Sequence, residues 1–199
     1  MKVLIASNNL GKVAIYKAVF DKLGIETTYP KELGIVVDVE ENGKTETENA
    51  VLKAKAFHEA TGLPTIANDS GLVIDKFSAE DQPGVLVRRF GGKELSDEEM
   101  LQVYIDKLNE VGGSSTGHYN VALALIDENG NLFTKEFQPK RYFVNKPSSV
   151  IKKGVPLSSL AYDEETGKYM SEMTPEEYQA YEAEAMQGQK DFIVEIFGK

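Results

Sequence analysis

The sequence predicts a mixed α/β fold, because strand-like and helix-like segments alternate early in the chain and a hairpin signal comes late. The first expected strand, 2–6, is a short apolar run that leads directly into a helical pattern. The hairpin signal is an Asn-Gly step at 129–130 between two strand-like segments, 118–126 and 132–144. A hairpin combined with alternating strands and helices favours a mixed sheet over a purely parallel one.

Capping and breaking residues bound the early elements. The first helix is expected over 12–23, with Gly24 directly after its last residue. Short strands are expected at 25–29 and 35–39, where proline and glycine interrupt the pattern. The capping-box sequence TETE then predicts a helix that begins at 45 and continues to about 61.

The later elements follow the same logic. Strand pieces are expected at 65–67 and 72–74, on either side of the polar stretch NDSG. A second capping-box sequence, SDEE, opens an expected helix over 96–110. The sequence TPEE at 174–177 begins another helix with proline at its first position, and 191–197 is either a helix or a strand.

The composition sets limits on the class of protein. The chain has 199 residues, 41% of them hydrophobic, which suits one large domain over 1–199, or two closely joined lobes, with a sizeable core. A formal net charge of -10 argues against nucleic-acid polymers as partners. The absence of cysteine excludes disulfides and thiolate catalysis, and two distant histidines argue against a multi-histidine metal site. Apolar runs are too short to span a membrane and no signal-peptide core follows the charged start, so a cytoplasmic protein is expected.

The polar loop SNNLGK after the first strand is a candidate phosphate site. It contains Ser7, Asn8, Asn9 and Lys12, and Gly11 relieves backbone strain within it. Backbone N–H groups at the start of a helix favour anions, and a lysine adds a flexible point charge. The loop does not match a Walker A sequence, and a simple asparagine turn explains it equally well.

Acidic residues follow two strand-like segments. Asp38, Glu40 and Glu41 end one of them, and Asn68 and Asp69 lie at the expected end of another. Mg²⁺ prefers oxygen ligands, often one or two carboxylates with substrate phosphates, and a carboxylate near a metal can orient or deprotonate water. Solvated turn residues are the plainer interpretation for acids in such positions.

Two more groups of residues are candidates for phosphate binding. Glu46, Asn49 and Lys53 stack on one side of an expected helix, where a solvated helix face is the alternative. Arg88 and Arg89 lie between glycines in PGVLVRRFGG and could clamp a phosphate. Pairing with the many surface acids is the competing interpretation for the two arginines.

The order of these motifs resembles the inosine triphosphate pyrophosphatase family. SNNLGK is followed by EENGKTETENAVLKAKA, IANDSGLVID and PGVLVRRFGG, over roughly the first half of the chain. Enzymes of this family are house-cleaning hydrolases that convert non-standard purine nucleoside triphosphates such as ITP, dITP and XTP to the monophosphate and pyrophosphate. The resemblance implies Mg²⁺ dependence, a homodimer, and a long curved mixed β-sheet flanked by helices, in two lobes with a central cleft.

The resemblance also implies roles for individual residues. Asp69 would be the catalytic base and, with Glu41, a metal ligand. Lys12 and Lys53 would neutralise charge on the phosphates and so belong with Asp69 to the catalytic group. The implied substrate-binding residues are Ser7, Asn8, Asn9, Lys12, Asn49, Lys53, Ser70 and Arg89.

The sequence departs from the family at positions that bear on activity. Asn68 replaces the first aspartate of the family's D-D-S-G-L, and an amide brings no charge and accepts no proton. The family's F-x-Y-D-P segment is missing, and Glu182-Ala183-Glu184 falls where S-H-R is expected. These changes imply altered base specificity. The alternative is a catalytically impaired homologue that binds a nucleotide or a partner, and the base, the sugar and the role of 148–190 stay open.

Overall fold

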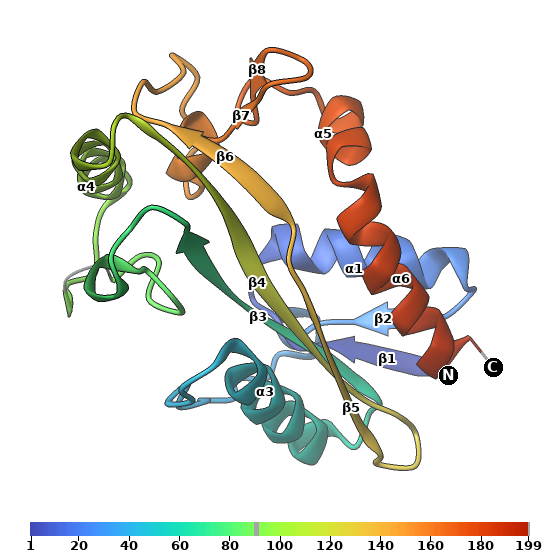
Figure 1. The fold of residues 1–199 in the computed structure, drawn as a ribbon. Helices are drawn as coiled ribbons and strands as arrows, with labels where there is room; N and C mark the ends of the chain where they lie inside the picture. Colours follow the sequence, from blue (N-terminus) through green and yellow to red (C-terminus); the bar gives the residue numbers. More distant parts are fainter. Residues whose placement is uncertain (90–91, 199) are drawn as a thin grey trace. The chain divides into compact units, whose positions relative to one another are not determined.

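The computed structural model describes residues 1–89 and 92–198, which fall into two compact units (Figure 1). Unit 1 comprises Met1–Ser70, Val121–Phe137 and Ala185–Lys199, and unit 2 comprises Gly71–Asn120 and Gln138–Glu184. Two long strands, β3 (Thr65–Ile74) and β4 (Ser114–Ile126), contribute residues to both units. The single domain expected over 1–199, with a cleft between two lobes, stays a prediction.

The main sheet is mixed, as expected. Its strands follow in the order β2 (Glu26–Thr28), β1 (Lys2–Ile5), β3, β4 and β5 (Leu132–Phe137), and β6 (Lys140–Val144) also pairs with β4. Strand β1 runs parallel to β2 and β3, whereas β4 runs antiparallel to β5 and β6. The predicted α/β class with helices on a mixed sheet is therefore confirmed.

Helices cover both faces of the sheet in unit 1. Helices α1 (Leu10–Lys22) and α6 (Ala183–Phe197) pack on one face, and α3 (Glu46–Thr61) packs on the other (Figure 1). Alternation along β1 explains this arrangement, because Val3 points into the core with α1 and α6 while Leu4 points into the core with α3. The short helix α2 (Pro30–Leu33) follows β2.

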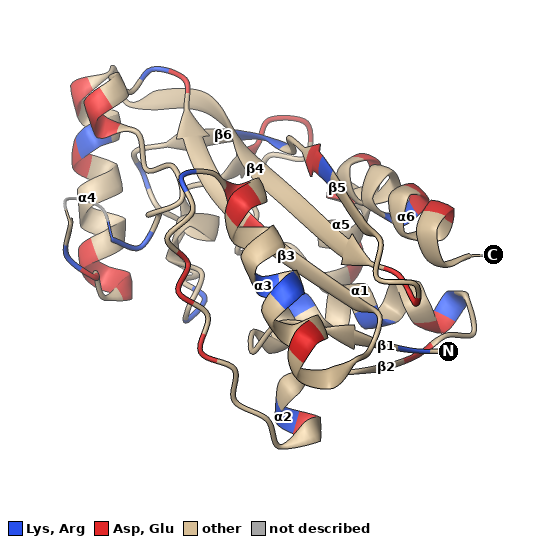
Figure 2. Cartoon of the chain, turned by 90° about the horizontal axis from the view of Figure 1, so that it is seen from below, with Lys and Arg blue, Asp and Glu red and all other residues tan. Residues whose placement is uncertain are grey.

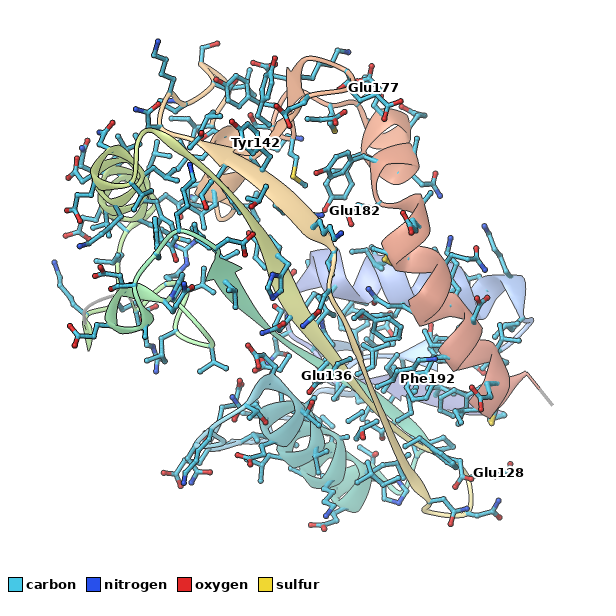
Figure 3. The ribbon with its side chains drawn as sticks, viewed as in Figure 1. Glu128, Glu136, Tyr142, Glu177, Glu182 and Phe192 are labelled. Carbon is cyan, nitrogen blue, oxygen red and sulfur yellow. The ribbon has the colours of Figure 1, made fainter. Side chains whose placement is uncertain are left out.

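Aromatic side chains close the core under α6. Phe192 points from α6 toward the strands of unit 1 (Figure 3), and its ring centroid lies 6.4 Å from that of Phe137 on β5. Phe20 of α1 meets Phe197 of α6 edge-on at 5.4 Å. Such aromatic pairs stabilise the core beyond the effect of the apolar area that they bury, and they hold α6 against α1 and β5.

Unit 2 has an apolar core of its own. Tyr104 and Leu108 of α4 (Asp97–Glu110) pack there with Phe143 of β6. Helix α4 begins with the predicted capping box, in which Ser96 and Glu99 bind each other's backbone N–H groups. Unit 2 also contains η1 (Ala79–Asp81), η3 (Pro156–Ser159), β7 (Tyr162–Asp163), β8 (Lys168–Tyr169) and α5 (Pro175–Tyr181).

Two expectations about strands in the first half are wrong. Residues 35–39 form no strand, although Ile35, Val37 and Val39 pack against the core under α3. Their alternation reflects one buried side, not a ladder of hydrogen bonds. The expected pieces at 65–67 and 72–74 are one continuous strand, so Asn68 and Asp69 lie inside β3 and not at a strand end.

Three boundaries in the second half also differ. The segment 132–144 is broken into β5 and β6 around Pro139, because proline has no N–H to give to the ladder. Strand β4 begins at Ser114, four residues before the strand expected at 118–126. The last helix begins at Ala183 and is twice as long as the segment 191–197 suggested. Within the described ranges 1–89 and 92–198, no helix is both long enough and apolar enough to cross a bilayer.

Candidate active site

Strand β3 presents neighbouring polar residues to opposite faces of the sheet. Asn68 is buried on the side of β3 that faces Tyr16 of α1, whose hydroxyl group donates to Gln189 Oε1 of α6 at 3.1 Å. Burial raises the pKa of Tyr16, and the nearby Asn68 side chain opposes this shift. Asp69 points the other way, toward α3, as the alternation of a strand requires. The two residues therefore belong to different environments, although they are adjacent in the sequence.

Helix α3 presents Asn49 and Lys53 on one side, one helical turn apart. The hydroxyl of Thr45 caps the helix by accepting from the Glu48 N–H at 3.1 Å. The Glu48 carboxylate accepts from the Lys44 N–H at 2.6 Å, not from Thr45, so only half of the predicted capping box forms. Figure 2 shows acidic and basic residues following one another along α3.

Lys53 joins two carboxylates. Its Nζ lies 2.8 Å from Asp69 Oδ1 and 3.1 Å from Glu41 Oε2. The side chains of Lys53 and Asp69 are each 13% exposed, whereas that of Glu41 is 47% exposed. Because exposed ion pairs are screened by water, the pair with Asp69 is the stronger of the two.

Asn49 connects the loop that contains Glu41 and Gly43 to β3. Its buried side chain donates to Asp69 Oδ2 at 3.2 Å and accepts from the Gly43 N–H at 2.9 Å. A Cβ atom on Gly43 would lie 2.6 Å from the Asn49 side-chain oxygen and 2.7 Å from Cβ of Glu48. Glycine is therefore required where the loop that carries Glu41 approaches α3.

The loop after β1 forms an asparagine turn, which was the alternative to a phosphate site in the sequence analysis. Asn9 Oδ1 accepts from the N–H groups of Gly11 at 2.9 Å and Lys12 at 3.3 Å, and Ser7 Oγ accepts from the Asn9 N–H at 3.1 Å. Asn8 and Asn9 are exposed, and Ser7 is half-buried. Since Asn9 already binds two of the helix N–H groups, positive charge in this loop comes chiefly from the Lys12 side chain.

Lys12 brings a second ammonium group into the electrostatic range of the same carboxylates. Burial lowers the pKa of Lys12, and the positive charge of Lys53 lowers it further. The negative charges of Asp69 and Glu41 oppose both effects. The structure thus brings two lysines and two carboxylates, all predicted as site residues, into one cluster in unit 1.

The remaining predicted site residues lie differently. Ser70 follows Asp69 on β3 and is half-buried, and Arg89 is an exposed residue of unit 2. Its neighbour Arg88 donates to Asp97 at 2.7 Å, so pairing with a surface acid is confirmed for Arg88. Phe90 and Gly91 of the same stretch lie outside the described residues.

Sequence reasoning missed a buried ion pair in unit 2. The guanidinium group of Arg141 on β6 donates to the carboxylate of Glu182, which lies just after α5 (Figure 3). The ring centroids of Tyr119 and Tyr181 lie 5.6 and 5.3 Å from the guanidinium carbon. Arg141 is 8% exposed, and its Nε is a buried donor that has no partner among the described residues. The only sequence signal was an arginine at an inward position of a strand.

The donor set in unit 1 suits a cation held with a phosphorylated ligand. Oxygen atoms of Glu41 and Asp69 converge on one point, the ammonium nitrogen of Lys53. Within 1–89 and 92–198, no group of three or more His, Asp or Glu residues is placed to hold a metal ion. Two carboxylates are enough for Mg²⁺ when phosphate oxygens complete its coordination.

Comparison with known proteins gives consistent matches. The Ham1 family model matches residues 3–187. The dITP/XTP pyrophosphatase of Leptospira interrogans is 37% identical over 127 residues, which cover 64% of this chain and only 63% of that protein. The dITP/XTP pyrophosphatase of Geobacillus kaustophilus is 33% identical over 177 residues, covering 88% of this chain and 85% of that protein. A solved structure of a HAM1 protein from Coxiella burnetii superposes with a TM-score of 0.78 at 27% identity, covering 98% of this chain and 99% of the other.

Proposed function

This chain belongs to the Ham1 family, and from that premise we propose that it is a nucleoside triphosphate pyrophosphatase, a hydrolase that acts on non-standard purine nucleotides. In the proposed reaction, a water oxygen forms a bond to the α-phosphorus, and the bond from that phosphorus to the bridging oxygen breaks. The products are a nucleoside monophosphate and pyrophosphate. Relatives named dITP/XTP pyrophosphatase support this choice of substrate class.

The observation that carries the proposal is the contact of Lys53 with Asp69 and Glu41, with Lys12 close enough to alter the electrostatics of the group. A polyphosphate chain needs cations around it, and an attacking water needs a carboxylate to orient it. The cluster supplies both kinds of group within one compact unit. A surface ion pair without function would not require the buried asparagine and the constrained glycine that surround this one.

In this proposal, Asp69 orients the attacking water and accepts its proton. Asn49 keeps the Asp69 carboxylate in place, and Lys12 and Lys53 neutralise charge that develops on the phosphate oxygens. Glu41 and Asp69 would hold Mg²⁺. When bound there, Mg²⁺ supplies charge neutralisation and alignment of the phosphates.

A substrate panel tests the proposal. Purified protein with Mg²⁺ is incubated with ordinary and non-standard triphosphates, and pyrophosphate release is measured. We expect release from triphosphates such as ITP, dITP or XTP. Thermal stabilisation by nucleotide without product would instead support the impaired homologue, which the missing S-H-R motif favours. Product from another phosphorylated metabolite alone would replace the proposed substrate class.

We also propose a homodimer and a cytoplasmic location. Both proposals rest on the family, whose house-cleaning substrates belong to the nucleotide pool. Size-exclusion chromatography with light scattering tests the first proposal, because a dimer has twice the 22.0 kDa mass of the chain. Fractionation of the source cells tests the second.

A further inference from the structure

We propose that Lys53 occupies the cation position of the free protein, so that a divalent cation is bound together with a polyphosphate and not before it. This inference rests on the proposed function, and it concerns the order in which the ligands bind. It assigns Lys53 a role in the free protein in addition to its proposed contact with phosphate. The relevant residues all lie in unit 1.

The geometry places the Lys53 ammonium group where a bridging cation would lie. The Nζ atom is within 2.8 Å of Asp69 Oδ1 and 3.1 Å of Glu41 Oε2. A divalent cation that binds the same two oxygen atoms would be in contact with this ammonium group, and like charges at such a distance repel strongly in a half-buried site. The Lys53 side chain must therefore move before the two carboxylates can share a cation.

The local charge also disfavours a cation in the free protein. The two ammonium groups of Lys12 and Lys53 balance the two carboxylates of Glu41 and Asp69. Asn68 adds no charge and faces the opposite side of β3, toward Tyr16. A free dication therefore meets balanced charges, at a site where both Asp69 oxygens and one Glu41 oxygen already have partners.

A polyphosphate changes this balance. Its oxygens carry several negative charges, and they offer the lysines partners at least as good as the carboxylates. Lysine has a flexible stem and a compact charge, so the Lys53 ammonium can swing from Asp69 to a phosphate without movement of α3. The oxygens of Glu41 and Asp69 are then free to complete the coordination of a cation that the phosphates also hold.

The test measures Mn²⁺ binding by electron paramagnetic resonance, with and without an α,β-imido analogue of dITP that cannot be cleaved to pyrophosphate. For the natural protein, we expect the analogue to tighten Mn²⁺ binding by at least tenfold. The variant Lys53→Met removes the ammonium and keeps an unbranched apolar stem that is one atom shorter. We expect it to bind Mn²⁺ without the analogue at least tenfold more tightly than the natural protein does.

Matched variants complete the design. Lys55→Met changes an exposed lysine on the same helix and should behave as the natural protein. Lys53→Gln serves as a second variant if Lys53→Met does not fold, with circular dichroism as the check. Equal Mn²⁺ binding by the free natural protein and the Lys53 variants would overturn the inference while leaving the proposed activity intact. Absence of Mn²⁺ binding with the analogue, together with absence of pyrophosphate release, would count against the proposed function itself.

Discussion

Asn49 donates a hydrogen bond to Asp69 Oδ2 at 3.2 Å, while Lys53, one turn further along the same helix, donates to Oδ1 at 2.8 Å. Two donors from one helix hold both oxygens of a single carboxylate. Because the donors are fixed by α3 and the acceptor by β3, the orientation of the carboxylate depends on how the helix packs on the strand. Secondary structure thus positions the proposed base.

Replacing Asp69 tests the proposed chemistry most directly. Asp69→Asn keeps the shape of the side chain but removes the charge and the ability to accept a proton. We expect pyrophosphate release to fall by about 100-fold or more. The matched control is Asp75→Asn, which changes a 49% exposed aspartate of unit 2 and should leave the rate unchanged. A rate unaffected by Asp69→Asn would remove Asp69 from the mechanism.

Gly43 provides a test of the loop that carries Glu41. In Gly43→Ala, the new methyl group would lie 2.6 Å from the side-chain oxygen of Asn49, so the loop must move away from α3. We expect a loss of stability of about 1–3 kcal/mol, as for other overpacked sites, and weaker Mn²⁺ binding in the presence of a triphosphate analogue. Urea unfolding and Mn²⁺ titration measure the two effects.

Lys44→Ala is the control for this change. It alters the next residue of the same loop but keeps the backbone N–H that Glu48 accepts from. The Lys44 side chain is exposed, so both readouts should stay close to those of the natural protein. If Gly43→Ala and Lys44→Ala behave alike, the close approach at Gly43 does not matter for the position of Glu41.

Much of the fold and of the cluster was predictable from local rules. The helices that begin near Thr45 and Ser96 follow from their capping residues. The helical period placed Asn49 and Lys53 on one side of α3, and the structure confirms that they share this side. These rules could not predict that Asn49 and Lys53 bind Asp69, because the strand that contains Asp69 was expected to end just before this residue.

Other features depend on contacts between segments far apart in the sequence. Pairing with neighbouring strands keeps β3 continuous through NDSG. From the sequence alone, the turn-forming residues of NDSG predicted a break in the strand at this point. The ion pair of Arg141 with Glu182 joins β6 to the end of α5, and neither segment contains a motif that requires the other. Non-local pairs of this kind are visible only in three dimensions.

A variant of Asn68 tests whether Asn68 and Asp69 lie on opposite faces of β3. Asn68→Asp restores the acid of the family motif, but places a carboxylate in the buried layer beside Tyr16. Because burial of a charge without a cationic partner is unfavourable, we expect the free energy of unfolding to fall by about 1–3 kcal/mol. Urea unfolding measures this change.

The same variant should leave metal binding unchanged. Asp69 points toward α3 and residue 68 toward α1, so the added carboxylate would lie on the wrong face to join Glu41. Mn²⁺ titration with a triphosphate analogue should therefore give the same affinity as for the natural protein. Clearly tighter Mn²⁺ binding by Asn68→Asp would show that both residues of the NDSG stretch can serve one site.

The capping box of α4 predicts a pH dependence of stability. A hydrogen bond from Lys93, with further bonds from Ser96, lowers the pKa of Glu99 to about 2. Because the folded pKa lies below the usual 4.5, Glu99 stabilises the protein above pH 4.5, and this contribution is lost as the pH falls toward 2. Glu99→Gln should therefore be less stable than the natural protein at pH 7 and similar to it near pH 2. Urea unfolding at both pH values measures this, with Glu98→Gln as the control.

The buried pair of Arg141 and Glu182 predicts a strongly non-additive double-variant cycle. Arg141→Met leaves the carboxylate of Glu182, which is 8% exposed, without its cation, and we expect a loss of about 3–5 kcal/mol in the free energy of unfolding. Glu182→Leu alone leaves the guanidinium unpaired between two tyrosine rings, with a similar loss. The double variant removes both charges and should recover most of the stability, because apolar side chains fill the same space without a desolvation penalty. Additive losses in urea unfolding would mean that water reaches the pair, and that neither charge depends on the other in unit 2.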